Sequence, residues 1–292
     1  MRDKFQQSDV NRLAHIELTS AESAGRWLHA LPAANNKVDP LLYKTMLQRW
    51  LRSPILPQDA EFTCGFCGEV MDSLGDHPLS CDCGADRTKR HNHIRNECFY
   101  QACLSPELEK PGLLEPRPLQ GTLPEDGVKR VNPAARRPAD VYIPRWHQGT
   151  PAALDFAVTS GLRANALRAT LQDAGSATAS YEDFKNNYLN TRSSCIDEGI
   201  QFKPMIMEAV GGGWGPTAIK VFYDLAKTKA TLTGETTNIA LNHIYQNLGI
   251  RLHRENARAI LRRCAPVSID AASILAAAAT LSAQDAIPDA LS

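Results

Sequence analysis

The sequence predicts an α/β fold with a separate, small cysteine-rich module. Strand-like apolar runs occur at 139–143, 153–159 and 202–210, and helical patterns lie between and after them. Four of the eight cysteines fall within 20 positions, from Cys64 to Cys83, in a stretch with little apolar periodicity. Such a stretch cannot bury enough apolar surface to fold unaided, so we expect a module that is distinct from the α/β part.

The N-terminal segment 1–60 is expected to be helical, with breaks at prolines. Ser20 is a candidate N-cap for a helix that Pro32 ends. Asp39-Pro40 begins a second helix, because aspartate is a favoured N-cap and proline a favoured first helical residue. We expect both helices to serve as packing surface.

The middle of the chain alternates helix and strand. A helix is expected over 88–104, with Thr88 as its N-cap, and a linker rich in proline and glycine follows from Pro106 to about Gly127. The runs 139–143 and 153–159, with a turn between them, are typical of a β-hairpin.

The last third of the chain is mainly helical. Residues 165–191 have a helical pattern that Gly175 and Ser176 can interrupt, and further helices are expected at 216–230 and 235–263. The expected domains are therefore 1–60 for the N-terminal helices, 61–87 for the cysteine module, 88–264 for the α/β domain and 265–292 for a disordered tail.

The composition excludes several classes of protein. The 292 residues carry 32 basic and 32 acidic side chains, so a surface coated with basic residues is excluded, although one basic face is allowed. A chain with 43% hydrophobic and 22% charged residues is globular. No run of about 18 apolar residues occurs and the first ten residues lack an apolar core, so we expect neither a membrane span nor a secretory signal. The uneven spacing of the cysteines favours an intracellular metal site over a disulfide scaffold.

The cysteine module has the spacing of a zinc site. Two residues separate Cys64 from Cys67 and three separate His77 from Cys81, with nine residues between the pairs. Zinc takes four tetrahedral ligands, and a two-residue gap lets one tight turn present two thiolates to the same ion. Cys83 competes with Cys81 for the fourth position, and we favour Cys81. Because four protein ligands leave no open position, the expected Zn²⁺ is structural.

Two aspartates occupy the predicted hairpin. Asp140 lies at the first strand and Asp155 lies inside the second, between apolar residues. An ionised carboxylate in such surroundings is costly unless it is paired or bound to a metal. Two of them on neighbouring strands can hold one divalent cation, and oxygen ligands suit Mg²⁺ or Mn²⁺. The alternative is that both have roles at strand ends or turns.

The aspartate pattern resembles the active site of the PD-(D/E)XK nucleases. More narrowly, the chain resembles the restriction-enzyme-like endonuclease domain at the C-terminal end of site-specific non-LTR retrotransposon polyproteins, which a CCHC zinc module similarly precedes. The resemblance extends from about Trp27 to Cys264. Its motifs are Trp27-Leu28-x-Ala30-Leu31-Pro32, Cys64-x2-Cys67-Gly68, Gly75-Asp76-His77-Pro78-Leu79-Ser80-Cys81, Arg90-His91-Asn92, Arg137-Pro138-Ala139-Asp140-Val141, Asp155-x-Ala157, Tyr181-x3-Lys185-x2-Tyr188 and Asn256-Ala257.

The resemblance implies a mixed sheet flanked by helices and a metal-dependent DNA endonuclease, with Asp140 and Asp155 as the Mg²⁺ or Mn²⁺ ligands. The generic motif ends in Asp/Glu-x-Lys, whereas Ala157 stands at its last position here. In this branch the lysine is typically displaced to the next helix, where Lys185 matches it. A further acidic residue often lies upstream. Glu97 and Glu115 are the candidates, and Glu97 is favoured because it lies on a regular element.

Clusters of basic residues are expected to bind nucleic-acid phosphates. The candidates are Lys89, Arg90, His91, Arg137, Arg258 and Arg262. Solvated helix faces are the alternative. The expected partner is DNA, or RNA of the same element, with a location in the nucleus of a eukaryote; the sequence does not define the oligomeric state.

Two other functions fit the same residues. One alternative is a former nuclease whose catalytic site has decayed and which only binds DNA or RNA. The missing lysine after Asp155 is consistent with this alternative. A structural zinc protein that binds other proteins would not bind DNA, which a gel shift at low salt would show. No Tyr-x-Asp-Asp polymerase signature occurs, so the sequence does not predict a reverse transcriptase in this chain.

Overall fold

The computed structural model describes residues 2–33, 36–57, 61–103, 139–146, 149–211 and 213–264. The described parts of Met1–Ala30 and His91–Ile250 form one compact unit, and the described parts of Leu31–Arg90 and Arg251–Ser292 form a second. The unit boundaries fall inside α4 (Asp86–Cys103) and α9 (Thr237–Cys264). The chain therefore divides differently from the expected segments, because the N-terminal helices belong to different units. The expected linker and C-terminal tail lie outside the described residues.

The first unit contains a small mixed sheet of β3 (Val141–Ile143), β4 (Ala152–Thr159) and β5 (Gln201–Glu208). β3 and β4 form the predicted hairpin and pair antiparallel, whereas β4 and β5 pair parallel. β4 is the central strand, as its largely apolar sequence requires. β5 is an edge strand and tolerates Pro204, which has no backbone N–H to donate.

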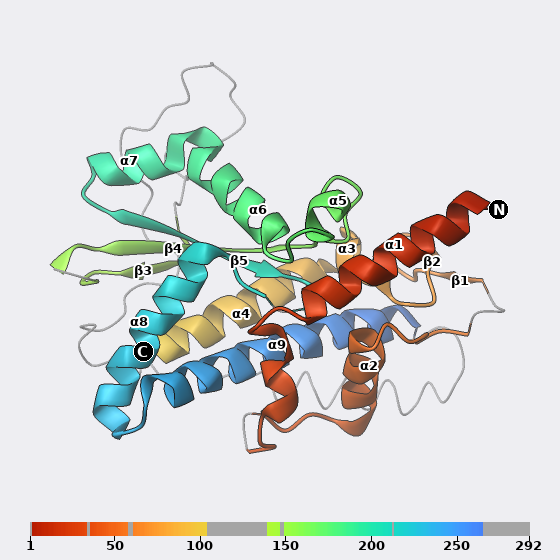
Figure 1. Cartoon of the computed structure of the whole chain (residues 1–292), viewed down its shortest axis with the longest axis horizontal. Coiled ribbons are helices and arrows are strands. Elements are labelled where there is room, and N and C mark those ends of the chain that lie inside the picture. The colour runs from red at the N-terminus through yellow and green to blue at the C-terminus, as the bar shows by residue number, and fades with distance from the viewer. Residues whose placement is uncertain are drawn as a thin grey trace. The chain divides into compact units, whose positions relative to one another are not determined.

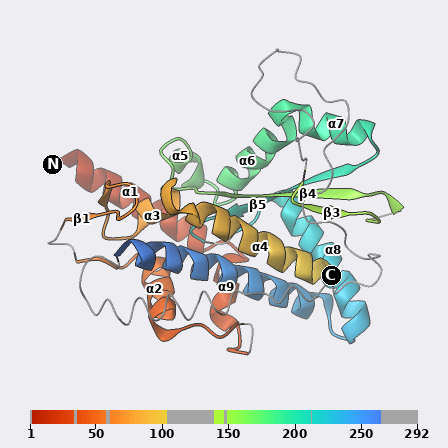
Figure 2. The same ribbon diagram turned by 180° about the vertical axis from the view of Figure 1, so that it is seen from behind.

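Helices flank this sheet, as the predicted fold class requires. The connection from β4 to β5 contains α5 (Leu167–Thr170), α6 (Ser176–Asn187), the 3₁₀ turn η6 (Tyr188–Asn190) and α7 (Thr191–Asp197). α6, α7 and α8 (Pro216–Thr233) all contact β5. α6 and α7 lie on one side of the sheet and α8 lies on the other (Figure 1, Figure 2). The predicted break at Gly175-Ser176 is confirmed, since α6 begins at Ser176.

A buried carboxylate fixes the carboxyl ends of β4 and β5. Glu208 is 1% exposed and accepts hydrogen bonds from the backbone N–H groups of Gly161 (3.0 Å), Val210 (2.6 Å) and Gly211 (2.7 Å). These bonds compensate the loss of hydration of the carboxylate. A Cβ on Gly211 would lie 2.5 Å from the Leu18 carbonyl oxygen, so only glycine allows this approach.

The N-terminal helices differ in part from the prediction. α1 (Arg2–Thr19) and the 3₁₀ helix η1 (Ala24–His29) belong to the first unit. Ser20 follows α1 instead of capping a helix, which corrects the prediction. α1 lies within the segment expected to be helical, although it contains many polar residues and lacks a clear apolar stripe. None of the described helices has the length and apolarity that crossing a membrane requires.

The second unit contains α2 (Pro40–Trp50), β1 (Phe62–Thr63), β2 (Val70–Met71), α3 (Asp76–Ser80) and the 3₁₀ turn η3 (Cys83–Ala85). The predicted N-cap of α2 is confirmed, because Asp39 Oδ1 accepts from the N–H groups of Leu41 (2.9 Å) and Leu42 (3.4 Å). α4 begins at Asp86, so Thr88 lies within the helix and is not its N-cap.

The end of α9 completes the core of the cysteine module. Cys264 packs against the module's buried cluster, and Arg263 is fully buried. Arg263 forms an ion pair with Asp86 and donates a hydrogen bond of 2.8 Å to the Cys83 carbonyl oxygen. The module therefore depends on residues about 180 positions further along the chain.

Candidate functional site

Four side chains of the second unit gather as a metal site would require. The ligand atoms of Cys64, Cys67, His77 and Cys81 all lie within 4.8 Å of one another. The Cys67 Sγ and His77 Nε2 atoms are 3.3 Å apart. Three thiols and one imidazole form a donor set typical of structural zinc, so the residues fit this metal. Cys81 belongs to the group and Cys83 does not, which agrees with the preference for Cys81.

Local backbone bonds bring the four ligands together. The N–H of Gly68 donates to the Cys64 carbonyl (2.8 Å), and Gly68 has a φ of +76°, which closes the turn between the first two cysteines. Asp72 accepts from the N–H groups of Asp76 (2.9 Å) and His77 (2.8 Å) and so begins α3. The N–H of Cys81 donates to the His77 carbonyl at the end of this helix.

The surroundings of Cys64 favour the thiolate, the form that binds metal. Burial acts to raise its pKa, but the backbone N–H groups of Phe66 and Cys67 and the side chain of His77 lower it to about 6. A low pKa is typical of cysteines that bind metals.

A second cluster lies in the first unit, where Asp140 forms hydrogen bonds to the backbone on both sides of Asp155. The N–H of Asp140 donates to the Leu154 carbonyl (2.9 Å), and Asp140 Oδ2 accepts from the N–H of Phe156 (2.7 Å). Asp140 thus bonds to both chain neighbours of Asp155. Its other oxygen, Oδ1, lies 3.2 Å from Nε2 of His91 on α4.

Lys185 completes this cluster from α6. Its Nζ atom lies 2.7 Å from Asp155 Oδ2, and both side chains are mostly buried, 23% and 19% exposed respectively. α6 packs on β5, the parallel neighbour of β4, and this packing directs the lysine to the carboxylate. The structure therefore brings together Asp140, Asp155 and Lys185, as well as His91.

The two carboxylates differ in how readily they ionise. Burial acts to raise both pKa values. His91, the Phe156 N–H and Lys185 outweigh burial at Asp140 and lower its pKa, whereas the pKa of Asp155 stays raised because the Asp140 charge adds to burial. Burial acts to lower the pKa of Lys185, but Asp155 raises it above its usual value. The pKa of Asp140 is therefore lowered and that of Asp155 is raised, although the adjacent Lys185 ammonium favours the ionised form of Asp155.

The two upstream acidic candidates have different positions. Glu97 lies on α4 six residues after His91, about 240° further around the helix, so its side chain leaves on a different side. It is buried and accepts a hydrogen bond of 2.9 Å from Gln101. After burial, the main influences on the pKa of Asp140 are His91, the Phe156 N–H and Lys185, and those on the pKa of Asp155 are Lys185, Asp140 and His91. Glu115 lies outside the described residues.

Three of the six predicted phosphate-binding residues make contacts within the second unit. Arg90 is 6% exposed and donates to Asn256 Oδ1 (2.9 Å) and the Leu79 carbonyl (3.3 Å). Arg258 lies 3.0 Å from Glu255, and Arg262 forms an ion pair with Asp86. The structure thus shows contacts of these three arginines within the second unit, and their binding to phosphates stays a prediction.

The remaining three members of that predicted group have different positions. Lys89 is exposed on α4, and His91 contacts Asp140. Arg137, together with Pro138 of the motif, lies outside the described residues. The sequence did not predict the contact between His91 and Asp140, because the two residues are separated by 49 positions and no pattern links them.

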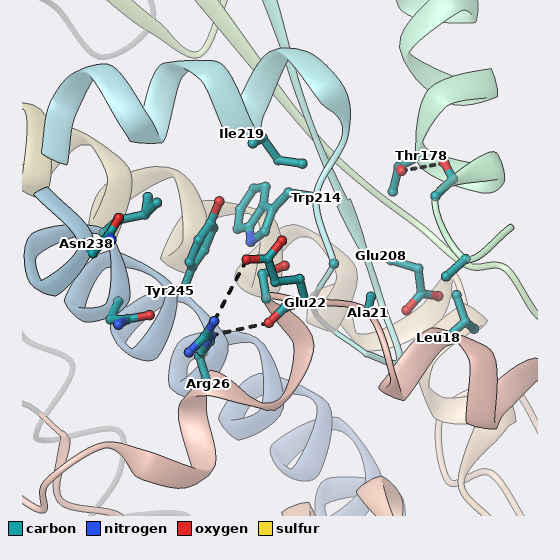
Figure 3. Close-up of a pocket in the computed structure, with 16 residues that line it drawn as sticks. Leu18, Ala21, Glu22, Arg26, Thr178, Glu208, Trp214, Ile219, Asn238 and Tyr245 are labelled. Carbon is teal, nitrogen blue, oxygen red and sulfur yellow. Dashed lines mark hydrogen bonds and ion pairs between the residues drawn. The ribbon is translucent and has the colours of Figure 1, made fainter. Parts of the chain in front are cut away.

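A separate cavity of about 470 Å³ lies in the first unit. Figure 3 shows Trp214 and Tyr245 next to each other on its wall, with the Glu22–Arg26 ion pair facing them. Burial and the charge of Glu22 raise the pKa of Tyr245 to about 12. None of the residues predicted to be catalytic, metal-binding or nucleic-acid-binding lines this cavity.

Comparison of the chain with models of known protein families and with curated proteins finds no match.

Proposed function

We propose that this protein is a metal-dependent DNA endonuclease of the PD-(D/E)XK type, related to the restriction-like endonucleases of non-LTR retrotransposons. The proposal rests on the close approach of Asp140, Asp155 and Lys185. Asp140 directly precedes β3, Asp155 lies on β4 and Lys185 lies on α6. These are the residue types that hydrolysis of a phosphodiester requires, namely two carboxylates for a hard cation and one fixed positive charge.

The donor set fits Mg²⁺ or Mn²⁺. Both prefer oxygen ligands, and Mg²⁺ is commonly held by one or two carboxylates, with waters and substrate phosphates completing its shell. Burial, with a smaller contribution from the charge of Asp140, keeps the pKa of Asp155 raised, and a cation between the two carboxylates would stabilise its ionised form. Asp140 and Asp155 are therefore the residues that would hold the ion, which polarises the phosphate and lowers the pKa of water when bound.

Lys185 acts in this proposal as a positive charge and not as a base. Its pKa is raised by Asp155, so the ammonium stays protonated near neutral pH. It can stabilise the negative charge that develops on the phosphate oxygens. His91, held by Asp140 Oδ1, is the side chain in the cluster best suited to accept a proton from the attacking water, because imidazole is the commonest catalytic base.

The Cys64–Cys67–His77–Cys81 site has a separate role in the proposal. Four protein ligands leave no position for substrate, so we assign it a structural Zn²⁺ that stabilises the second unit. DNA is the proposed partner, and exposed Lys89 on α4 is one proposed contact to its phosphates.

Nicking of supercoiled plasmid DNA tests the proposal. The zinc-loaded full chain should nick the plasmid with Mg²⁺ and not without it, and Asp140→Asn or Asp155→Asn should abolish nicking. Asp183→Asn is the matched control, because this exposed aspartate lies on α6 outside the cluster. Nicking by Asp155→Asn at the parent rate would overturn the proposal. DNA binding without any nicking by the parent would instead favour the nuclease that has lost its activity.

A further inference from the structure

Three aromatic rings form a continuous row, two on α6 and one at Tyr188, the residue that follows this helix. The ring centroids of Tyr181 and Phe184 are 5.5 Å apart, and those of Phe184 and Tyr188 are 5.3 Å apart, with interplanar angles of 45° and 37°. Phe184 is 50% exposed and Tyr188 is 51% exposed. The three rings thus form one continuous and partly exposed aromatic surface.

The aromatic row adjoins the candidate active site. Lys185 lies between Phe184 and Tyr188 in the sequence and reaches Asp155, and Tyr181 is among the groups that shift the pKa of Lys185. A strand that occupied the row would therefore pass beside the two carboxylates. This continuity separates the row from scattered apolar residues, which need no explanation.

Positive charge adjoins the Tyr181 end of the row. The Arg163 guanidinium carbon lies 5.9 Å from the centroid of the Tyr181 ring. Arg163 is exposed, and its Nε atom donates to the neutral carbonyl of Ser160, so this bond does not neutralise its charge. An aromatic row with a cation at its end is complementary to a partner that has flat rings and phosphates.

The backbone after the row is held in an unusual conformation. Leu189 has a φ of +51° and Asn190 has a φ of +54°, and left-handed backbone is rare for a residue such as leucine. This turn follows Tyr188, whose ring packs against Phe184, and leads into α7. Backbone of this kind is retained where the surrounding structure requires it, often at functional sites.

From these contacts we infer that Tyr181, Phe184 and Tyr188 form a stacking site for unpaired bases of a DNA strand that enters the cleavage centre. Aromatic side chains beside a positive charge bind single strands because every base has a flat face that can stack on them. The inference rests on the proposed function for the identity of the partner. It adds that the enzyme holds an unwound or single-stranded segment next to the scissile phosphate.

Binding of single-stranded oligonucleotides in the absence of Mg²⁺ tests this inference without cleavage. The probes are a fluorescent 20-mer DNA and an abasic strand of the same length, which has the phosphates but no bases. The zinc-loaded full chain should bind the 20-mer much more tightly than the abasic strand. Phe184→Leu and Tyr188→Leu should each weaken 20-mer binding by about 5- to 150-fold, the range for loss of one stacking contact.

Matched variants separate stacking from damage to the fold. Tyr223→Leu removes an equally exposed ring, 50% exposed on α8, and should change binding by less than about 2-fold. Phe184→Tyr and Tyr188→Phe keep a ring and should bind like the parent. Equal affinity for the abasic strand, or an equal loss in Tyr223→Leu, would overturn the inference.

The two proposals can fail separately. If the parent binds the 20-mer through Phe184 and Tyr188 but never nicks DNA with Mg²⁺, the nuclease proposal fails and the stacking site stands. If the parent nicks DNA while Phe184→Leu and Tyr188→Leu bind the 20-mer and nick like the parent, the stacking site fails and the nuclease stands.

Discussion

The Lys185 ammonium lies 2.7 Å from the Asp155 carboxylate, although the two residues are thirty positions apart in the chain. Asp155 lies on β4. Two residues further along this strand stands Ala157, at the position where a PD-(D/E)XK nuclease typically has lysine. α6 supplies the positive charge instead. In the proposed nuclease, Lys185 from a helix packed on the adjoining strand takes the place of the lysine of the strand itself.

We expect zinc to bind one set of four ligands in the second unit. The purified chain should contain about one equivalent of Zn²⁺, and Cys64→Ser, Cys67→Ser, His77→Ala or Cys81→Ser should each lose it. Cys83→Ser should retain the metal, because Cys83 lies outside the group of four. Metal content measured by mass spectrometry checks this. Loss of zinc from Cys83→Ser, with retention in Cys81→Ser, would reassign the fourth ligand.

Removal of the zinc should unfold the module selectively. A small loop-rich segment depends on its metal for folding free energy, so chelation should increase hydrogen exchange across residues 61–83. The central strand β4 of the first unit serves as the internal control and should keep its protection. Unchanged protection of 61–83 after complete zinc removal would contradict a structural role for the metal.

Asp76 should make stability depend on pH. Burial acts to raise its pKa, but Arg49, 2.6 Å away, and Arg52, 3.1 Å away, hold it below its usual value. A carboxyl whose pKa is lower in the folded state stabilises the protein above its unfolded pKa of about 3.9 and loses this contribution as the pH falls. Asp76→Asn should therefore lower the free energy of unfolding at pH 7, with a difference that shrinks towards pH 3.

Urea unfolding of parent and variant at each pH measures that difference. Asp183→Asn, which replaces an exposed carboxylate, should show little difference from the parent at any pH. A difference for Asp76→Asn that grows as the pH falls would have the wrong sign for this explanation.

Arg263 should contribute more to stability than Arg262. Both pair with Asp86, but Arg263 is fully buried and also donates to the Cys83 and Ala259 carbonyls, whereas Arg262 is partly exposed. Removing one partner of a buried pair costs about 3–5 kcal/mol, and an exposed pair contributes about 1 kcal/mol or less. Arg263→Met should lower the free energy of unfolding by more than Arg262→Met, and by less than the first range because Asp86 keeps Arg262 as a partner. Equal effects of Arg263→Met and Arg262→Met would contradict this difference.

Local signals in the sequence predicted the parts of the fold that local chemistry determines. Asp39 caps α2 because an aspartate before a proline favours a helix start, and the two apolar runs around a turn formed the β3–β4 hairpin. The ligand group of the cysteine module also follows from short spacings. Each of these features depends on residues close together in the chain.

Features that depend on distant residues could not be predicted in this way. Arg90 and His91 are adjacent, yet their side chains leave α4 about 100° apart, so one bonds to Asn256 and the other to Asp140. A cluster of basic residues in the sequence does not show which side chains form ion pairs or hydrogen bonds with residues more than 100 positions away. The ion pairs of Arg262 and Arg263 with Asp86 could not be predicted for the same reason.

The most direct test of the account is the single-turnover rate of DNA cleavage by Lys185→Ala with saturating Mg²⁺. Loss of a positioned charged group in an active site should lower the rate by roughly 10²–10⁴-fold. Lys227→Ala, an exposed lysine on α8, is the matched control and should cleave like the parent. Circular dichroism and zinc content should confirm that both variants are folded. A folded, zinc-containing Lys185→Ala variant that cleaves at the parent rate would contradict the claim that Lys185 replaces the missing lysine of β4.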